Sequence, residues 1–193
     1  MPIIVNRDER RAEVVALAFE LIADRGVEAL TFREIASVAG CSTSIVSHYF
    51  GNKNELLFNI YRVANQRATQ RLTAAHESGL PLATCFEIIL PFSDEARRNW
   101  RVWLAFWARA HLDPAYFDER RSAALAGLDL YRGIIADRCG AAVDEQRIML
   151  AARRLTALIA GLGLEICFAP DEWTLDRVRG VLASELDTLG IHL

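Results

Sequence analysis

The chain has 193 residues, 52% of them hydrophobic, with only 5 prolines and 11 glycines, and this composition excludes a disordered or low-complexity protein. Its length allows one large domain or two small ones with a substantial core. The formal net charge of −3 neither supports nor excludes a nucleic-acid partner, so a functional argument depends on local chemistry.

The first predicted element is an amphipathic helix over residues 8–25. Apolar side chains recur on one stripe of this helix, and Gly26 supplies its stop. Three arginines lie at its start: Arg7, Arg10 and Arg11. They can form an N-terminal arm that adds nonspecific affinity for DNA, but an ordinary solvated helix start explains them equally well.

Residues 31–50 predict two short helices that meet at a tight corner. Thr31 and Glu34 form a capping box, in which the hydroxyl accepts from the third helical N–H and the carboxylate reaches back. Gly40 ends the first helix, and Ser42 is the next available N-cap. The inward face of the first helix is expected to be Ile35, Ala36, Val38 and Ala39.

The second helix of the corner, expected over residues 43–49, has few apolar anchors. These anchors are Ile45, Val46 and Phe50. The other side chains are polar or have a polar tip, and such groups suit phosphates and base edges: Thr43, Ser44, Ser47, His48 and Tyr49. Such a helix-turn-helix can place its second helix in a DNA major groove, although similar corners occur in all-α proteins of other function.

Lys53, the only lysine in the chain, stands at the start of the next predicted helix. A cation there opposes the helix dipole, which is locally unfavourable. An anionic partner accounts for this placement, and a solvated lysine is the alternative.

The segment CSTSIVSHYFGNKNELL, residues 41–57, resembles the DNA-binding domain of the TetR family of bacterial repressors. Within that family it is most similar to the betaine-pathway, BetI-like regulators, which share the pattern STxIxSHYFxxKxxLL. The resemblance covers roughly residues 8–60, and beyond that only helix count and length agree. It implies a homodimer that reads the two half-sites of a palindromic operator, and a variable C-terminal domain that dimerises and binds a small-molecule inducer.

The resemblance also assigns roles to single residues. It implies that the start of the first motif helix, at Thr31 and Phe32, touches a phosphate. Arg33 can reach a base edge, with an ion pair to Glu34 or simple solvation as alternatives. Many relatives carry an aromatic residue at the position of Ser47, where the serine has a shorter reach.

The face of the recognition helix expected to meet bases is formed by Thr43, Ser44 and Ser47. His48 and Tyr49 are expected to hold phosphates, with Tyr49 alternatively part of the core, and Lys53 is expected to contact a phosphate. The complete predicted DNA-binding set is Thr31, Phe32, Arg33, Ser42, Thr43, Ser44, Ser47, His48, Tyr49 and Lys53.

Helical periodicity continues to the C-terminus. A long helix is predicted over residues 53–75, and a break near 77–81 marks a domain boundary. Five helices are expected beyond it, over 82–90, 93–110, 114–139, 144–168 and 174–189. The predicted fold is therefore all-α, with a three-helix DNA-binding domain at 8–68 and a larger ligand-binding and dimerisation domain at 80–193.

An aromatic run, NWRVWLAFW, gives the C-terminal half its candidate ligand site. Its three tryptophans share one helix face, which suits either a bulky hydrophobic core or an aromatic cage for a cation. A cage for a quaternary ammonium would agree with the choline-type inducers that the resemblance to betaine regulators suggests. The predicted cage residues are Trp100, Trp103, Phe106, Trp107, Tyr116, Phe117 and Glu165.

Two apolar stripes in the last two helices predict the dimer interface, and packing within the chain is the alternative. The small-residue stripe is Ala157, Ala160, Gly161 and Leu164. The second stripe is Leu175, Val178, Leu182 and Leu186.

Other functional classes receive little support from the sequence. Motifs typical of hydrolases, zinc proteases and nucleotide-binding enzymes are missing, and the four histidines lack the spacing of metal ligands. The four widely spaced cysteines are expected to be reduced and structural, and no apolar run reaches the length of a membrane span. The hypothesis is a cytoplasmic, homodimeric transcriptional repressor that binds double-stranded DNA and responds to a ligand. It is expected to have no enzymatic activity, cofactor or metal. The alternative is a helical ligand-binding or adaptor protein that does not recognise a DNA sequence.

Overall fold

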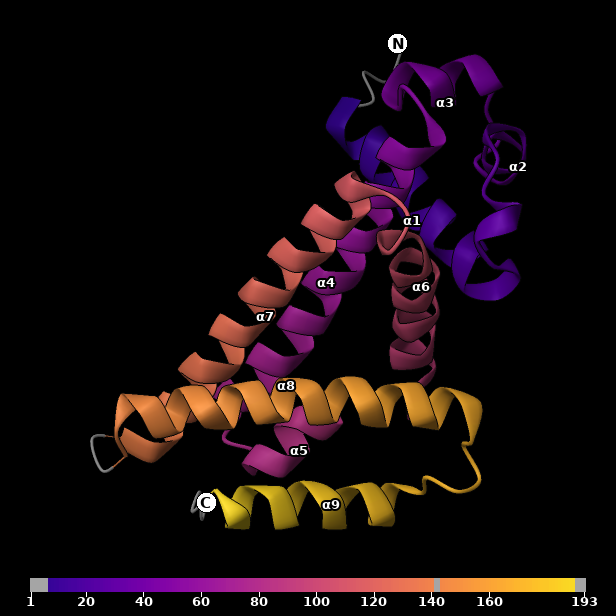
Figure 1. Cartoon of the computed structure of the whole chain (residues 1–193). Coiled ribbons are helices and arrows are strands. Elements are labelled where there is room, and N and C mark those ends of the chain that lie inside the picture. The colour runs from indigo at the N-terminus through magenta and orange to yellow at the C-terminus, as the bar shows by residue number, and fades with distance from the viewer. Residues whose placement is uncertain (1–6, 141–142, 190–193) are drawn as a thin grey trace. The chain divides into compact units, whose positions relative to one another are not determined.

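Helices account for most of the chain in the computed structural model, which describes residues 7–140 and 143–189 (Figure 1). No strand occurs in these two ranges, and the predicted all-α class is confirmed. The helices are α1 (Arg7–Arg25), α2 (Phe32–Val38), α3 (Thr43–Tyr49), α4 (Lys53–Glu77), α5 (Leu82–Glu87), α6 (Asp94–Ala110), α7 (Pro114–Cys139), α8 (Glu145–Phe168) and α9 (Leu175–Thr188), with a 3₁₀ turn, η1 (Val27–Ala29), after α1.

Local capping chemistry explains why the helices begin where the sequence predicts. The Asp144 carboxylate accepts from the Arg147 N–H at 3.0 Å, and the Thr174 hydroxyl accepts from the Arg177 N–H at 3.4 Å. The larger differences from prediction are the η1 turn, which was not expected, and α5, which ends at Glu87 instead of Leu90. Pro91 accounts for the exclusion of Leu90 from the helix, because the residue before a proline is disfavoured in the α conformation.

The described chain packs as two compact units, and α4, α6 and α7 each contribute to both. The first unit contains residues 7–65 and 101–119, and the second contains the described residues of 66–100 and 120–189. The predicted domain limits of 8–68 and 80–193 were drawn along the sequence, whereas packing assigns residues 101–119 to the first unit. None of the described helices has both the length and the hydropathy needed to cross a membrane.

The core of the first unit is built from α1, α2, α3 and the beginning of α4. Arg101 is also tied to α1, since its guanidinium donates to the Ala23 carbonyl at 2.9 Å. Fully buried residues of this core include Val14, Phe19, Ile22, Ile35, Val46, Phe50, Leu56, Leu57 and Ile60.

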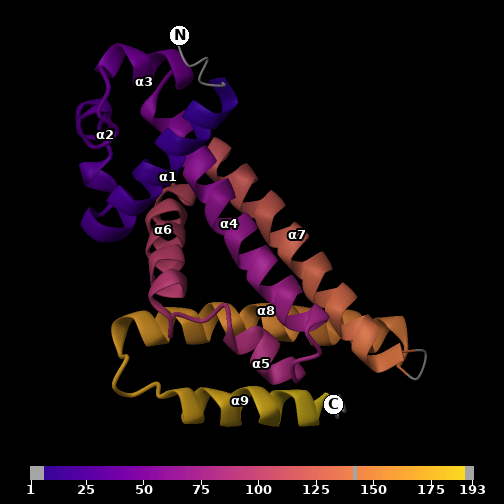
Figure 2. The same ribbon diagram turned by 180° about the vertical axis from the view of Figure 1, so that it is seen from behind.

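In the second unit, α8 and α9 run antiparallel, and α5 packs against α9 (Figures 1 and 2). The Arg179 guanidinium of α9 makes a bidentate ion pair with Glu87 at the end of α5, at 2.6 and 3.1 Å. Arg154 of α8 pairs with Glu185 of α9 at 2.6 Å. These two ion pairs fix α9 against its own subunit on both sides.

Trp100 packs directly on the backbone of α8. The indole is buried and donates its N–H to the Ile89 carbonyl at 2.8 Å. A Cβ built on Gly163 would lie only 1.9 Å from Trp100 Cζ2, so this part of the core requires glycine at residue 163.

The C-terminal end of α4 is held by Arg138 of α7, within the second unit. Its Nη2 donates to the carbonyls of His76 and Leu80, at 3.2 and 2.7 Å, and its Nε donates to His76 Nδ1 at 3.2 Å. His76 Nε2 lies 2.8 Å from an Asp137 oxygen. A cation at a helix C-terminus complements the dipole, and here it also satisfies carbonyls that lack helical partners.

Candidate DNA-binding surface

The start of α2 is capped as the sequence predicts, but only on one side. The Thr31 hydroxyl accepts from the Glu34 N–H at 3.1 Å. The predicted return bond from the Glu34 carboxylate is wrong, because that carboxylate pairs with Arg25 at the end of α1, 3.1 Å away. Arg33 is thereby left exposed beside Thr31 and Phe32, and it has no ion pair among the described residues.

The corner between α2 and α3 is closed by the backbone and by a side chain from α1. Gly40 has a φ of +60°, and the Cys41 N–H donates back to the Ala36 carbonyl at 2.9 Å. Arg10 donates to the carbonyl of Ala39 at 3.2 Å and pairs with Glu13, which raises the pKa of the guanidinium. Arg10 is therefore part of the corner.

Arg11 also has partners within the first unit. Its guanidinium lies 5.0 Å above the Phe50 ring, and it is 3.7 Å from a Glu55 carboxylate oxygen. Of the three arginines considered for an N-terminal arm, Arg7 is exposed, and Arg10 and Arg11 are half-buried.

The recognition helix α3 has one buried apolar side, which anchors it to the core, and one exposed polar side. Val46 and Phe50 are completely buried. The four polar residues predicted to face outward are exposed: Thr43, Ser44, Ser47 and His48. Tyr49 is half-buried. The prediction that Ile45 is an apolar anchor is wrong, since its side chain is 41% exposed. The prediction that Val38 belongs to the inward face of α2 is also wrong, since its side chain is 50% exposed.

Two hydroxyl contacts tie the exposed serines of α3 together. Ser42 occupies the N-cap position with extended backbone, but its side chain makes no cap bond and lies 2.7 Å from the Ser44 hydroxyl instead. Ser47 Oγ donates to the Ser44 carbonyl at 3.0 Å. The serines are thus pre-oriented on the helix surface.

Lys53 is the first residue of α4 and lies between Asn52 and Glu55, which form a helix cap that sequence reasoning missed. Asn52 Oδ1 accepts from the Glu55 N–H at 2.9 Å, while the Glu55 carboxylate accepts from the Gly51 N–H at 2.8 Å. The spacing Asn-Lys-Asn-Glu could have revealed it. Lys53 is half-exposed and has no acidic partner in the described ranges, so its charge is available to an anion.

One open hollow of about 510 Å³ lies directly on the recognition surface. It is lined by Arg10 of α1 and by Ser44, Ile45, His48 and Tyr49 of α3. A cation, a hydroxyl, an imidazole and a phenol therefore converge beside an exposed apolar side chain. This set can hydrogen-bond phosphate and base edges and can also make an apolar contact.

The predicted cage residues are divided between the two units. Trp100 and Glu165 belong to the second unit, where Trp100 is core and Glu165 is exposed; the other five belong to the first. Phe106 stacks on Tyr61 with ring centroids 3.8 Å apart. The alternative interpretation, a packed aromatic core, describes Trp100 and Phe106.

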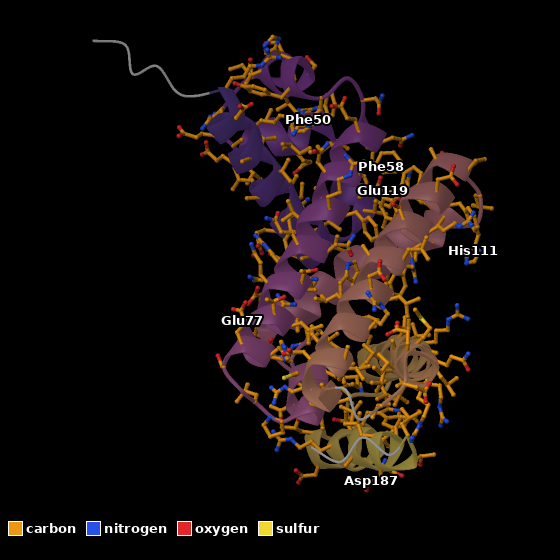
Figure 3. All side chains as sticks on the ribbon, turned by 90° about the vertical axis from the view of Figure 1, so that its left-hand side faces the viewer. Phe50, Phe58, Glu77, His111, Glu119 and Asp187 are labelled. Atoms are coloured by element: carbon orange, nitrogen blue, oxygen red, sulfur yellow. The ribbon has the colours of Figure 1, made fainter. Side chains whose placement is uncertain are left out.

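Tyr116 joins the same core. Its ring lies 4.7 Å from that of Phe58, near the Arg62–Glu119 ion pair; Phe58 and Glu119 are labelled in Figure 3. Burial raises the pKa of the Tyr116 phenol, which donates to Asn54 Oδ1 at 2.9 Å.

Trp103 and Trp107 remain half-buried and stack in parallel, with centroids 6.1 Å apart. Their indole N–H groups donate to Asn65 Oδ1 at 2.9 Å and to the Tyr61 hydroxyl at 3.3 Å. Phe117 is 53% exposed.

The two predicted dimer stripes differ in exposure. The outer face of α8, formed by Leu150, Ala157, Gly161, Leu164 and Phe168, is exposed, with Ala160 half-buried at its edge. In α9, Val178, Leu182 and Leu186 are buried within the subunit, and Leu175 is half-buried. The α9 stripe is therefore packed inside its own chain and is not part of an exposed surface.

The cysteines and potential metal ligands are the remaining candidates for chemistry. The four cysteines are free, and burial raises the pKa of the Cys85 and Cys139 thiols. Within the described ranges, no group of three or more His, Cys, Asp or Glu side chains is arranged to hold a metal ion.

Comparisons with known proteins agree with this architecture. Residues 14–60 match the family described as "Bacterial regulatory proteins, tetR family", and residues 80–190 match "BetI-type transcriptional repressor, C-terminal". The BetI regulator of Pseudomonas aeruginosa PAO1 is 30% identical over 194 residues, covering 97% of this chain and 96% of its own. The PksA regulator of Bacillus subtilis is 28% identical over 203 residues, covering 100% of this chain and 95% of its own.

Solved structures share the fold across nearly the whole chain. A transcriptional regulator from Saccharomonospora viridis, solved in complex with choline, has a TM-score of 0.78 at 26% identity and covers 93% of this chain and 96% of its own. A regulator from Rhodococcus sp. Rha1 has a TM-score of 0.77 at 22% identity, covering 93% and 95%. The helix-turn-helix surface and these matches together establish that the chain belongs to the TetR family of DNA-binding transcriptional regulators, which are not enzymes, and carries a BetI-type repressor C-terminal domain.

Proposed function

We propose that the protein is a homodimeric repressor that binds a palindromic operator and is released from it by a small cationic inducer. The observation that carries the proposal is the exposed polar face of α3, anchored by Val46 and Phe50, beside the unpaired charge of Lys53. In the dimer, two such helices would lie about 34–36 Å apart, one turn of DNA. The proposed domains remain 8–68 for DNA binding and 80–193 for ligand binding and dimerisation.

The proposed contacts divide into two kinds. Phosphates are held at the start of α2 by Thr31 and Phe32, at the end of α3 by His48 and Tyr49, and at the start of α4 by Lys53. Bases are read by Thr43, Ser44 and Ser47 of α3 and by Arg33, whose guanidinium can bind guanine in a bidentate manner. The contacting set on and beside α3 is Ser42, Thr43, Ser44, Ser47, His48 and Tyr49.

The outer face of α8 is the proposed dimer interface. Small side chains at Ala157 and Gly161 allow close approach of a second α8, while Leu164 and Phe168 supply apolar area. Because α9 buries its apolar stripe inside the subunit, it would contribute through its exposed polar side.

Choline or another quaternary ammonium is the first candidate inducer. The support is the likeness to the Saccharomonospora viridis regulator solved with choline, together with the partly exposed parallel indoles of Trp103 and Trp107. Release from DNA requires that the ligand bind one spacing of the recognition helices better than the other. Helix α4 is a suitable carrier of such a change, since it begins at Lys53 and continues into the second unit.

Replacing Lys53 by alanine should weaken binding to every DNA sequence to a similar extent. A lysine that neutralises a phosphate releases a counterion, so the slope of log affinity against log salt should fall by about one for each subunit bound. Gel shifts with the chain's own upstream promoter region, repeated between low and moderate salt, measure both effects.

Arg62 provides the matched control for this experiment. It is another cation of α4, but it is already paired with Glu119 at 2.7 Å, so Arg62→Ala should leave the salt slope unchanged. An unchanged slope in Lys53→Ala would remove Lys53 from the interface. If the wild-type protein forms no salt-sensitive, sequence-preferring complex, the alternative of a helical ligand-binding or adaptor protein is favoured.

Choline and betaine aldehyde are expected to change the tryptophan fluorescence and to weaken DNA binding in the same concentration range. Desolvated cation–π contacts are worth about 2 kcal/mol, so 3,3-dimethylbutanol, an uncharged isostere of choline, should bind at least about tenfold more weakly. Trp103→Leu should reduce the response to choline without affecting DNA binding. Absence of any response at millimolar ligand would exclude this class of inducer.

A further inference from the structure

The recognition helix exposes one apolar side chain among polar ones. Ile45 is 41% exposed, whereas the fully buried anchors of α3 are Val46 and the following Phe50. The core of the first unit therefore does not need Ile45 as a third anchor. Ile45 is thus an exposed apolar side chain on a surface that otherwise carries hydroxyl groups and an imidazole.

Helix geometry places Ile45 on the part of α3 that faces away from the core. Successive residues are rotated by about 100°, so that Ser44 and His48 lie almost opposite the buried Val46. Ile45 lies about 100° from Val46 on one flank, and Ser47 lies at a similar angle on the other. Ile45 therefore lies on the edge of the exposed face, about 60° from His48.

The surroundings of Ile45 leave room for a small apolar group next to an anion. Ile45 forms part of the wall of the hollow, together with Ser44, His48 and Tyr49. The rings of His48 and Tyr49 meet edge to face, 5.6 Å between centroids. Arg10, held by Ala39 and Glu13, places a positive charge at the same hollow.

We propose that Ile45 reads a thymine in each half-site through apolar contact with its 5-methyl group. This inference rests on the proposed DNA-binding function. Thymine alone among the four bases presents a methyl group in the major groove, and apolar side chains are the groups that recognise it. The neighbouring serines and His48 then form hydrogen bonds with the DNA.

The test pairs a change in the protein with a change in the DNA. Full-length wild-type protein first selects its site from random double-stranded DNA, and each thymine of that site is then replaced by deoxyuridine, which lacks only the methyl group. At one symmetry-related pair of positions, affinity should fall about fourfold per methyl removed, as expected for the loss of one buried CH₂-sized group. In Ile45→Ser the same replacement should have no effect.

Val38→Ser is the matched control, because Val38 is also an exposed apolar residue of the helix-turn-helix but lies on α2. It should retain the full sensitivity to deoxyuridine. Circular dichroism and thermal unfolding check that both variants are folded as the wild type is. Equal sensitivity in Ile45→Ser and wild type, no sensitive thymine, or a selected site without thymine would each overturn the inference while leaving sequence-specific binding intact. Failure to select any sequence would overturn the proposed function itself.

Discussion

Replacing Gly163 by alanine is expected to destabilise the second unit strongly. The new Cβ would lie 1.9 Å from Trp100 Cζ2 and 2.1 Å from Cη2, far inside van der Waals contact. The indole cannot simply move aside, because it is buried and its N–H is bonded to the Ile89 carbonyl. Overpacking of this kind costs about 1–3 kcal/mol and occasionally more, which thermal and denaturant unfolding will detect.

Gly133→Ala is the control for this substitution. Gly133 is a helical glycine of α7 in the same unit, and among the described residues nothing beyond its own stretch of helix lies within 4 Å of its ideal Cβ. Alanine there should be neutral or should stabilise by up to about 1 kcal/mol, because the helical propensity of alanine is higher. Adding Trp100→Phe to Gly163→Ala should restore part of the stability by shortening the ring. Equal stability of Gly163→Ala and wild type would contradict the packing of Trp100 on α8.

Replacing Leu164 by glutamate should convert the protein into a monomer that binds its operator weakly. In a two-fold interface the substitution places two carboxylates, one from each copy, into the same apolar contact. Since Leu164 is already 40% exposed in the subunit, the fold of each copy should be preserved. Loss of the second recognition helix should reduce operator affinity by about 10²- to 10⁴-fold.

Light scattering and gel shifts on the same preparation measure both effects. Leu125→Glu is a suitable control, since Leu125 of α7 is 56% exposed but lies outside the outer face of α8. It should leave both oligomeric state and affinity unchanged. A Leu164→Glu protein that remains dimeric would show that the copies associate through another surface.

The limits of the helices were predictable because they depend on neighbouring residues. Gly40 adopts the left-handed conformation that ends α2, while Asp144 and Thr174 cap the helices that follow them. Such effects act over three or four residues and are visible in the sequence. The exposure of Thr43, Ser44, Ser47 and His48 followed equally well from their polarity.

Features that depend on distant partners were not predictable. The Glu34 carboxylate has two possible partners, and only the tertiary structure reveals that Arg25 is the nearer one. Ile45 and Val46 are adjacent hydrophobic residues, and periodicity over a seven-residue helix does not decide which of them is buried. The apolar stripe of α9 likewise suits either an intrachain or an intermolecular neighbour, and in the structure α9 packs against α5 and α8 of its own chain.

The Arg138 contact holds one end of α4, so that any tilt of this helix would move mainly its other end. Its C-terminal end is fastened to α7 through the carbonyls of His76 and Leu80, whereas Lys53 stands at its other end. A continuous helix of 25 residues is about 36 Å long, so a tilt of about 5° about the fastened end displaces the Lys53 end by about 3 Å. That displacement is close to the rise of one base pair, about 3.4 Å. We therefore expect that even a small ligand-dependent tilt at the Arg138 end of α4 would move the Lys53 end by about the length of one base-pair step.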